Sequence, residues 1–235
     1  MYLKRKKKEN QMKTRKEVEI ELSSSICSKL KNAIAKKGSA SLLISGGSTP
    51  VQLFKELSNG NIDWSKVNVI PVDERFLPNE HPDQNGTLIK KHLLINKAST
   101  ANFCPLILNS TDAEINLNAV KKSIKAILRP FTVVILGMGA DGHTASLFPC
   151  SKELEYGLDL SNNDDLIITN PTTANYQRIS FTRKALLNTD NLFIHCYGDE
   201  KKQLLDTLDL NSEKTYPIKA FIAQNNIKPE LFWSK

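Results

Sequence analysis

The strongest constraint on the fold is a unit that repeats along the chain: a short apolar run, a tight polar turn and a segment with helical spacing. The apolar runs occupy residues 41–45, 67–72, 131–136 and 191–197. Helices are expected over 49–57, over 87–94 and from 199 through 208, and residues 17–37 are expected to pass from a short strand into an amphipathic helix. Buried strands that alternate with helices predict an α/β fold with a mostly parallel sheet and helices on both faces, as in Rossmann-like proteins.

In such a sheet, ligands bind beyond the carboxyl ends of the strands. The unusual turns of this chain all follow predicted strands; they are Gly46-Gly47, Asp73-Glu74-Arg75, the segment 137–143 and the segment 198–201. We therefore expect these turns to meet at one edge of the sheet and to form the binding site.

The chain has 235 residues, which is enough for one domain with its own core, and we expect a single domain over residues 17–235. The formal net charge is +7, but much of the excess lies in residues 1–16, where lysine and arginine outnumber the single acid Glu9. A basic arm can bind nucleic acid. Because no aromatic interleaving or recognition motif accompanies it, a solvated, disordered tail is favoured and no nucleic-acid partner is expected.

Cysteine usage and hydropathy exclude further classes. The four cysteines are widely separated, with no Cys-x-x-Cys pair and no Cys/His spacing suited to zinc. The basic start leads into no apolar segment of a secretory signal, and the apolar runs are far shorter than the roughly 20 residues that a membrane helix needs. We expect a cytoplasmic protein with reduced thiols, no membrane partner and no bound metal.

The turn after the first predicted strand contains Gly46, Gly47 and Ser48. Adjacent glycines permit a positive φ and close approach of the backbone, which leaves amide groups and the Ser48 hydroxyl available for an anion at a helix N-terminus. This suits a phosphate, but a plain tight turn with a capping hydroxyl explains the pattern equally well. The pattern is neither Gly-x-Gly-x-x-Gly nor a Walker A sequence, so nucleotide binding receives no support.

The turn after the second strand places Asp73 and Arg75 where a crevice is expected. The planar guanidinium of Arg75 could hold a phosphate or a carboxylate, while a solvated turn with a local ion pair is the alternative interpretation. The loop that follows contains Asn85, which carries no chemical signal by itself.

The glycine-rich segment 137–143 contains Gly139 and ends on Asp141 and His143. It brings an imidazole to the mouth of the sheet on a tightly turned backbone, and histidine is the side chain best suited to general-base work near neutral pH. His143 is therefore the candidate base. His92, in a helical stretch, and His195, in an apolar strand, are expected to be structural.

Three motifs occur in order: Ser-Gly-Gly-Ser-Thr-Pro at 45–50, Val-Asp-Glu-Arg at 72–75 and Leu-Gly-Met-Gly-Ala-Asp-Gly-His-Thr-Ala-Ser-Leu-Phe-Pro at 136–149. Together they resemble the 6-phosphogluconolactonase family over roughly residues 40 to 205, and the third motif is specific by itself. The resemblance implies the fold shared by glucosamine-6-phosphate deaminases, ribose-5-phosphate isomerases and coenzyme A transferases. It also implies hydrolysis of 6-phospho-D-glucono-1,5-lactone to 6-phospho-D-gluconate in the oxidative pentose phosphate pathway, without metal or organic cofactor, by a monomer.

The resemblance further implies a role for each candidate residue. His143 would be the general base that activates water. Asp141 is expected to be catalytic as well, by orienting either His143 or the loop. Arg178 and Lys201 would supply positive charge to the substrate phosphate. The substrate-binding positions would be Gly46, Gly47, Ser48, Asp73, Arg75, Asn85, Gly139, Arg178 and Lys201.

Two other functions remain open at this point. A glucosamine-6-phosphate deaminase would resemble this chain, but such enzymes carry a glutamate five residues past the histidine, where this chain has Phe148. A sugar-phosphate-binding regulator without turnover could retain the same pocket. Turnover that depends on His143 would separate the enzyme from the regulator.

Overall fold

The computed structural model describes residues 13–207 and 215–235. Its helices are α1 (Arg15–Lys37), α2 (Val51–Ser58), α3 (Asn85–His92), α4 (Ala113–Ile124), α5 (Leu154–Leu158), α6 (Arg183–Leu187), α7 (Asp199–Asp206) and α8 (Lys219–Ile222), with 3-10 turns at Trp64–Lys66 and Asn96–Thr100. Its strands are β1 (Ala40–Ile44), β2 (Val67–Pro71), β3 (Asp73–Arg75), β4 (Asn102–Phe103), β5 (Val133–Leu136), β6 (Leu166–Thr169), β7 (Arg178–Phe181), β8 (Leu192–Tyr197) and β9 (Glu230–Ser234).

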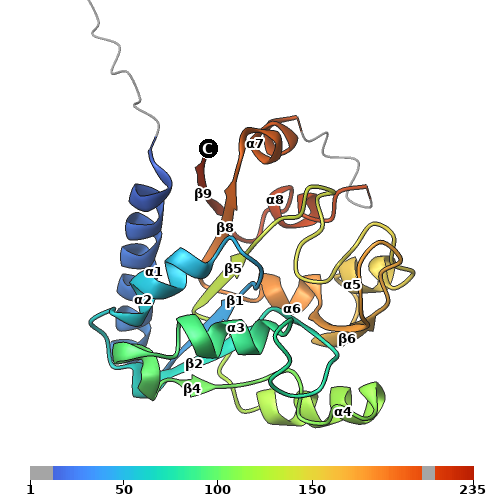
Figure 1. The fold of residues 1–235 in the computed structure, drawn as a ribbon, viewed down its shortest axis with the longest axis horizontal. Helices are drawn as coiled ribbons and strands as arrows, with labels where there is room; N and C mark the ends of the chain where they lie inside the picture. The colour runs from blue at the N-terminus through green and yellow to red at the C-terminus, as the bar shows by residue number, and fades with distance from the viewer. Residues whose placement is uncertain (1–12, 208–214) are drawn as a thin grey trace, which may run out of the picture.

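Six of these strands form one sheet in the order β4-β2-β1-β5-β8-β9, in which neighbouring strands are parallel (Figure 1). The mostly parallel α/β sheet expected from the repeating unit is thus confirmed. The four apolar runs of the sequence became β1, β2, β5 and β8, the four central strands of this sheet.

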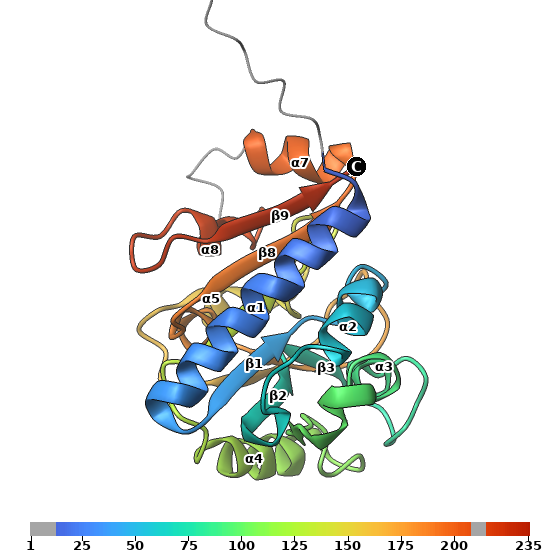
Figure 2. The same cartoon turned by 90° about the vertical axis from the view of Figure 1, so that its left-hand side faces the viewer.

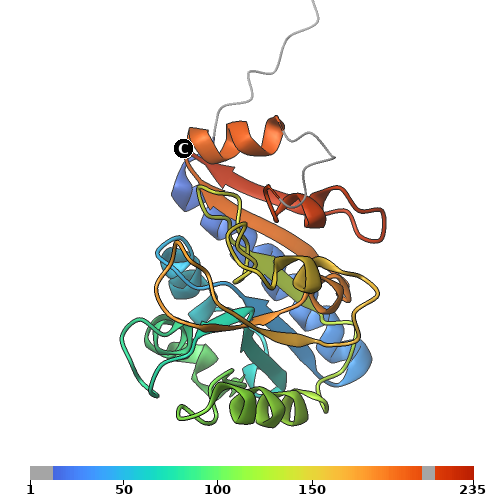
Figure 3. The ribbon, with the colours of Figure 1, turned by 90° about the vertical axis from the view of Figure 1, so that its right-hand side faces the viewer.

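Each central strand buries both of its faces, because side chains alternate between the two sides of a sheet. On β1, Leu42 and Ile44 pack with α1, α2 and α3, whereas Leu43 packs with α4, α6 and the strands of a second sheet. Figure 2 shows α1 lying across one face of the main sheet, and Figure 3 shows the opposite side with α4 and the C-terminal segments. Helices therefore cover both faces, as predicted.

Helix α1 corrects the expectation for the N-terminal segment. The short strand expected at the start of residues 17–37 is part of this helix: α1 begins at Arg15 after Thr14, whose hydroxyl accepts from the backbone N–H of Glu17 while the Glu17 carboxylate accepts from the N–H of Thr14. Leu22, Ile26 and Leu30 recur every four residues and are buried. This spacing places them on one face of a helix, and the same residues in a strand would not share one face with this period. Two residues of the expected tail, Arg15 and Lys16, belong to this helix, and residues 1–12 of that tail lie outside the described residues.

A second, antiparallel sheet has the order β3-β7-β6 and was not expected from the sequence. Asp73 to Arg75 looked like a polar turn but form β3, in which Arg75 pairs with Arg178 of β7. The strand is polar because one side of it faces a cavity, so it lacks the apolar alternation that predicts a strand.

Within the described residues, no helix is both long enough and apolar enough to cross a membrane.

Candidate active site

A cavity of about 230 Å³ lies beyond the carboxyl ends of β1, β5 and β8. Three loops that follow these strands line it, together with β3 and β7 of the second sheet. Because these strands are parallel, the turns after them meet at one edge, as the sequence predicted. Ser45 joins two of the loops, since its hydroxyl donates to the carbonyl oxygen of Ile135 (3.1 Å) and accepts from the N–H of Gly137 (2.9 Å).

The 137–143 loop folds tightly around its own histidine. The N–H of Gly139 donates to the carbonyl of His143 (2.9 Å), and the N–H of Gly142 donates to the carbonyl of Gly139 (3.1 Å). A Cβ atom on residue 139 would lie 2.2 Å from the imidazole ring, so only glycine allows the ring to lie there. Gly142 has a φ of +75°, which favours glycine for a second reason.

His143 forms a pair with Asp141. The distance from Nδ1 of His143 to Oδ1 of Asp141 is 2.5 Å, and the same oxygen accepts from the N–H of His143 (3.2 Å). An Nδ1–H that donates to a carboxylate fixes the tautomer and leaves Nε2 as the basic nitrogen. The sequence could not tell whether the Asp141 carboxylate reaches the imidazole; in the structure it does.

Phe148 holds the other side of this histidine. The rings of His143 and Phe148 stack with centroids 4.0 Å apart and an interplanar angle of 23°. The guanidinium carbon of Arg178 lies 5.1 Å from the centroid of the same phenyl ring. Phe148 is buried and thus positions both an imidazole and a cation, a role that the sequence did not reveal.

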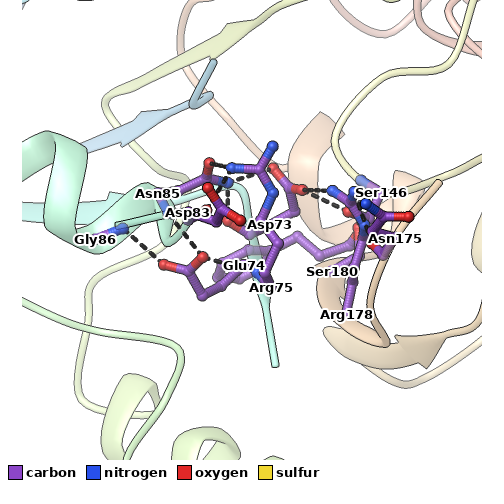
Figure 4. A network of polar contacts seen from close by, with 11 residues as sticks. Asp73, Glu74, Arg75, Asp83, Asn85, Gly86, Ser146, Asn175, Arg178 and Ser180 are labelled. Atoms are coloured by element: carbon purple, nitrogen blue, oxygen red, sulfur yellow. Dashed lines mark hydrogen bonds and ion pairs between the residues drawn. The ribbon is translucent and has the colours of Figure 1, made fainter. Parts of the chain in front are cut away.

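Asn85, Asp73 and Arg75 form an interlocked network on the β3 side (Figure 4). Nη1 of Arg75 donates to Oδ1 of Asn85 (2.8 Å) and to the carbonyl of Asp83 (2.7 Å). Nδ2 of Asn85 donates to the carbonyl of Asp73 (2.8 Å). The Asp73 carboxylate also accepts from the hydroxyl of Ser146, which ties β3 to the segment after His143.

Arg178 lies deep in the same region, only 8% exposed, with Nη1 3.9 Å from the Asp73 carboxylate. Burial lowers the pKa of Arg178; Asp73 acts in the opposite direction, and Arg75 adds to the lowering. A buried guanidinium with one carboxylate at a distance is a ready partner for a dianionic group.

The third cation, Lys201, stands in the first turn of α7 and is half-buried. Gly198, with a φ of +97°, turns the chain from β8 into this helix. His195 of β8 also lines the cavity but is 2% exposed, with Nε2 3.3 Å from a carboxylate oxygen of the buried Glu19. That contact fits the structural role expected for His195.

The first loop closes the cavity beside Asn85. A Cβ atom on residue 46 would lie 1.9 Å from Oδ1 of Asn85, so the close approach requires Gly46. Gly47 has a φ of +87°, and Ser48 is exposed at the cavity wall. The positive φ and the close approach expected of these two glycines are thus both present.

The structure brings the predicted site residues together. Those that line the one cavity are Gly46, Gly47, Ser48, Asp73, Arg75, Asn85, Gly139, His143, Arg178 and Lys201. Asp141 contacts His143 from outside the lining. Ser146 and Glu74 were missed; both stand inside the matched motifs, but neither residue type signals a site contact by itself. Over residues 13–207 and 215–235, no group of three or more His, Cys, Asp or Glu side chains could hold a metal ion.

The same fold occurs in a sugar-phosphate deaminase. A solved structure described as a monomeric glucosamine-6-phosphate deaminase matches with a TM-score of 0.73, covering 93% of this chain and 94% of that one, at 13% identity, which shows the shared fold alone. The family model described as glucosamine-6-phosphate isomerases/6-phosphogluconolactonase matches residues 13–233. The chain belongs to this family.

Two relatives are more similar in sequence. The 6-phosphogluconolactonase of Neisseria meningitidis serogroup A is 34% identical over 216 residues, which cover 91% of this chain and 93% of that protein. The crystal structure of a 6-phosphogluconolactonase from Shewanella baltica OS155 matches with a TM-score of 0.90 at 41% identity, covering 94% of this chain and 95% of that one. The relatives are therefore matched over nearly their full length.

Proposed function

We propose that the protein hydrolyses 6-phospho-D-glucono-1,5-lactone to 6-phospho-D-gluconate, with His143 as the general base. The observation that carries this proposal is the His143–Asp141 pair, 2.5 Å apart, at a cavity lined by Arg75, Arg178 and Lys201. A lactone with a phosphate needs a base for water and cations for the phosphate, and this cavity has both. The names of the similar proteins agree with this substrate.

Water is activated at Nε2 of His143. The Asp141 carboxylate accepts from Nδ1–H and stabilises the imidazolium that forms when Nε2 takes a proton from water. Stacking on Phe148 restricts rotation of the ring, so Nε2 keeps its direction toward the cavity. The hydroxide equivalent adds to the lactone carbonyl carbon and forms a tetrahedral intermediate.

The negative charge on that intermediate needs a donor. Three amides of the glycine-rich loop are engaged within the protein: Gly137 donates to Ser45, Gly139 to His143, and Gly142 to Gly139. We therefore assign the charge stabilisation to Arg75, whose guanidinium lines the cavity and is held by Asn85. Collapse of the intermediate breaks the bond to the ring oxygen, which takes the proton from the His143 imidazolium and becomes the 5-hydroxyl.

The phosphate is assigned to Arg178 and Lys201, with the Gly46-Gly47-Ser48 turn as a source of further donors. Each charge-assisted hydrogen bond is worth about 1.5–3 kcal/mol when partly desolvated. Arg178 meets that condition because it is buried. Loss of either cation should weaken binding more than it slows the chemical step.

The surroundings of His143 argue against the deaminase alternative. The glutamate expected there in a deaminase is replaced by Phe148, which stacks on the imidazole and offers no proton-transfer group. Asp141 is thus the carboxylate that contacts His143 among the described residues. We also propose that the protein acts in the cytoplasm, and that it acts as a monomer, because one chain supplies all the candidate site residues.

The experiment is lactone disappearance, with the lactone generated in situ by glucose-6-phosphate dehydrogenase and compared with the spontaneous background. Wild-type protein should accelerate hydrolysis, and His143→Ala should lower kcat by about 100- to 10,000-fold, the range for a lost general base. A folded wild-type protein without acceleration would refute the proposal. Ammonia release from glucosamine 6-phosphate would then test the deaminase, and binding without turnover would favour the regulator.

A further inference from the structure

Glu74 lies in the middle of β3 but on the opposite side from the cavity. Asp73 and Arg75 line the cavity, and strand alternation turns the side chain between them away from it. The Glu74 carboxylate is 2% exposed and points toward the start of α3 (Figure 4). It does not itself line the cavity, so its presence there needs a different explanation.

The carboxylate accepts three backbone hydrogen bonds. Its Oε1 accepts from the N–H of Arg75 (2.7 Å) and of Asn85 (2.8 Å), and its Oε2 accepts from the N–H of Gly86 (2.6 Å). The last two amides open α3, whose preceding residue Gln84 provides no side-chain cap. Glu74 therefore caps α3 from a neighbouring strand and at the same time fixes the backbone of Arg75.

Burial makes this arrangement costly. It raises the pKa of Glu74 to about 7, although the three N–H donors lower it, and the nearby Asp73 carboxylate raises it further. An apolar side chain would fill the same space without that penalty. An apolar side chain, however, could not accept the hydrogen bonds of the three backbone N–H groups.

The positions of these N–H groups determine where two cavity residues, Arg75 and Asn85, lie. Asn85 begins the capped helix, and its side-chain amide accepts from Arg75 and donates to the carbonyl of Asp73. Gly46 approaches the same amide so closely that it admits no Cβ. A shift of the start of α3 would therefore move the partner of the Arg75 guanidinium and one wall of the cavity.

We propose that Glu74 is a positioning residue, which fixes Arg75 and Asn85 in the geometry that binds the substrate by joining β3 to the first turn of α3. This role deepens the proposed function and rests on it only for the identity of the ligand. Glu74 touches no reacting atom. Its loss should therefore act through Arg75 and Asn85. It should weaken substrate binding and, because Arg75 is assigned to the charge on the tetrahedral intermediate, it should also lower kcat, while the His143–Asp141 pair on a different loop stays intact.

The test compares Glu74→Gln with wild type. Glutamine keeps the size but presents an NH2 group to one of the three backbone donors, so one hydrogen bond is replaced by a donor–donor contact. We expect kcat/KM for the lactone to fall about 5- to 30-fold, through a higher KM and a lower kcat together, because about 1–2 kcal/mol of positioning is lost. Calorimetric binding of 6-phosphogluconate should weaken as well, by up to the same factor.

The matched control is Asp112→Ala. Asp112 caps α4 by accepting from the N–H of Ile115 (2.8 Å) and does not line the cavity. This variant should unfold at a lower urea concentration than wild type, without a change in kcat/KM. If it lowered kcat/KM as much as Glu74→Gln does, the effect would be general destabilisation and the positioning role would be wrong. An unchanged kcat/KM in Glu74→Gln, or an unchanged affinity for 6-phosphogluconate, would overturn it as well.

Two further measurements cover the cases in which Glu74→Gln does not fold or the proposed function fails. If Glu74→Gln does not fold, Glu74→Asp, which is one methylene too short to reach both Arg75 and α3, is judged by the same criteria. If wild type neither hydrolyses the lactone nor binds 6-phosphogluconate, the proposed function fails. The positioning role is then decided by phenylglyoxal modification of Arg75 measured by mass spectrometry: a faster rate in Glu74→Gln supports it, and an unchanged rate overturns it.

Discussion

The cations of the cavity fall into two groups that are built differently. In the first group, which we call the interlocked end, Arg75 and Arg178 stand on paired strands; Arg75 donates to Asn85, Arg178 lies near Asp73, and Asn85 donates to the Asp73 carbonyl. The other cation, Lys201, stands on α7, a helix with no buried residue, which follows a single glycine. Side chains from four segments hold the interlocked end, whereas Lys201 depends on one helix turn.

The difference shows how a site can combine orientation with access. Cations held by neighbouring side chains keep a fixed geometry, because those neighbours restrict their rotamers, and the buried Arg178 is also poorly solvated before a ligand arrives. A half-exposed lysine on a surface helix adjusts to the ligand but loses side-chain entropy when it binds. We infer that the interlocked end sets the orientation of the substrate and that Lys201 adds charge.

The largest effects should come from removing one cation from each group. Arg178→Met and Lys201→Met should each raise KM about 10- to 150-fold, the equivalent of one charge-assisted hydrogen bond. Only Arg178→Met should also lower the free energy of unfolding, by about 1–3 kcal/mol, because it leaves the buried Asp73 with less positive charge nearby. Lys201→Met should stay within about 0.5 kcal/mol.

Steady-state kinetics and urea unfolding of both variants check this pair. Equal stability of the two variants would show that the interlocked end is no more tightly built than the surroundings of Lys201. A loss of kcat without a rise in KM for either variant would contradict its assignment to the phosphate.

The pH dependence of stability sharpens the description of the interlocked end. The pKa of Glu74 is raised by burial from 4.5 to about 7, so the folded state holds this proton more tightly than the unfolded state does. Its contribution to stability is therefore fully present below pH 4.5 and is lost as the pH rises to about 7, by on the order of 2–3 kcal/mol.

Subtracting the unfolding free energy of Glu74→Gln from that of wild type isolates this group, since the other titrating residues cancel. The difference should fall as the pH rises from 4.5 to about 7 and then level off. A difference that is constant over this range would mean that burial does not raise the pKa of Glu74.

A methyl group on Gly46 tests the same region without removing a charge. Its Cβ would lie 1.9 Å from Oδ1 of Asn85, so Gly46→Ala should cost about 1–3 kcal/mol of stability through overpacking and should displace the partner of Arg75. Gly137→Ala is the matched control in another loop of the cavity, because its Cβ would lie 3.6 Å from the nearest atom, Cβ of Ser45. Thermal unfolding should give a lower melting temperature for Gly46→Ala than for Gly137→Ala. Equal melting temperatures would mean that the Asn85 side chain moves aside at little cost.

Much of the fold was predictable from local patterns. The four central strands could be located because parallel strands buried on both faces are short continuous apolar runs, as in Leu42-Leu43-Ile44. The second sheet could not be located, because β3 is a polar strand whose partner, β7, lies about a hundred residues further along the chain. The N-terminal helix was partly mistaken for a strand, because its apolar residues were interpreted without knowing which surface they cover.

The sequence by itself determined the chemistry at the edge of the sheet: a glycine-containing turn after three of the four predicted strands, a charged turn after the other, and a histidine two residues after an aspartate. These depend on neighbours in the chain, and residue types and spacing determine them. Only the tertiary structure decided that Arg75 pairs with Arg178, that Phe148 stacks on His143, and that Glu74 caps α3. The first of these contacts joins segments about a hundred residues apart, and the other two depend on how the backbone between the partners folds, because burial and hydrogen bonding are satisfied by whichever groups the packed fold brings together.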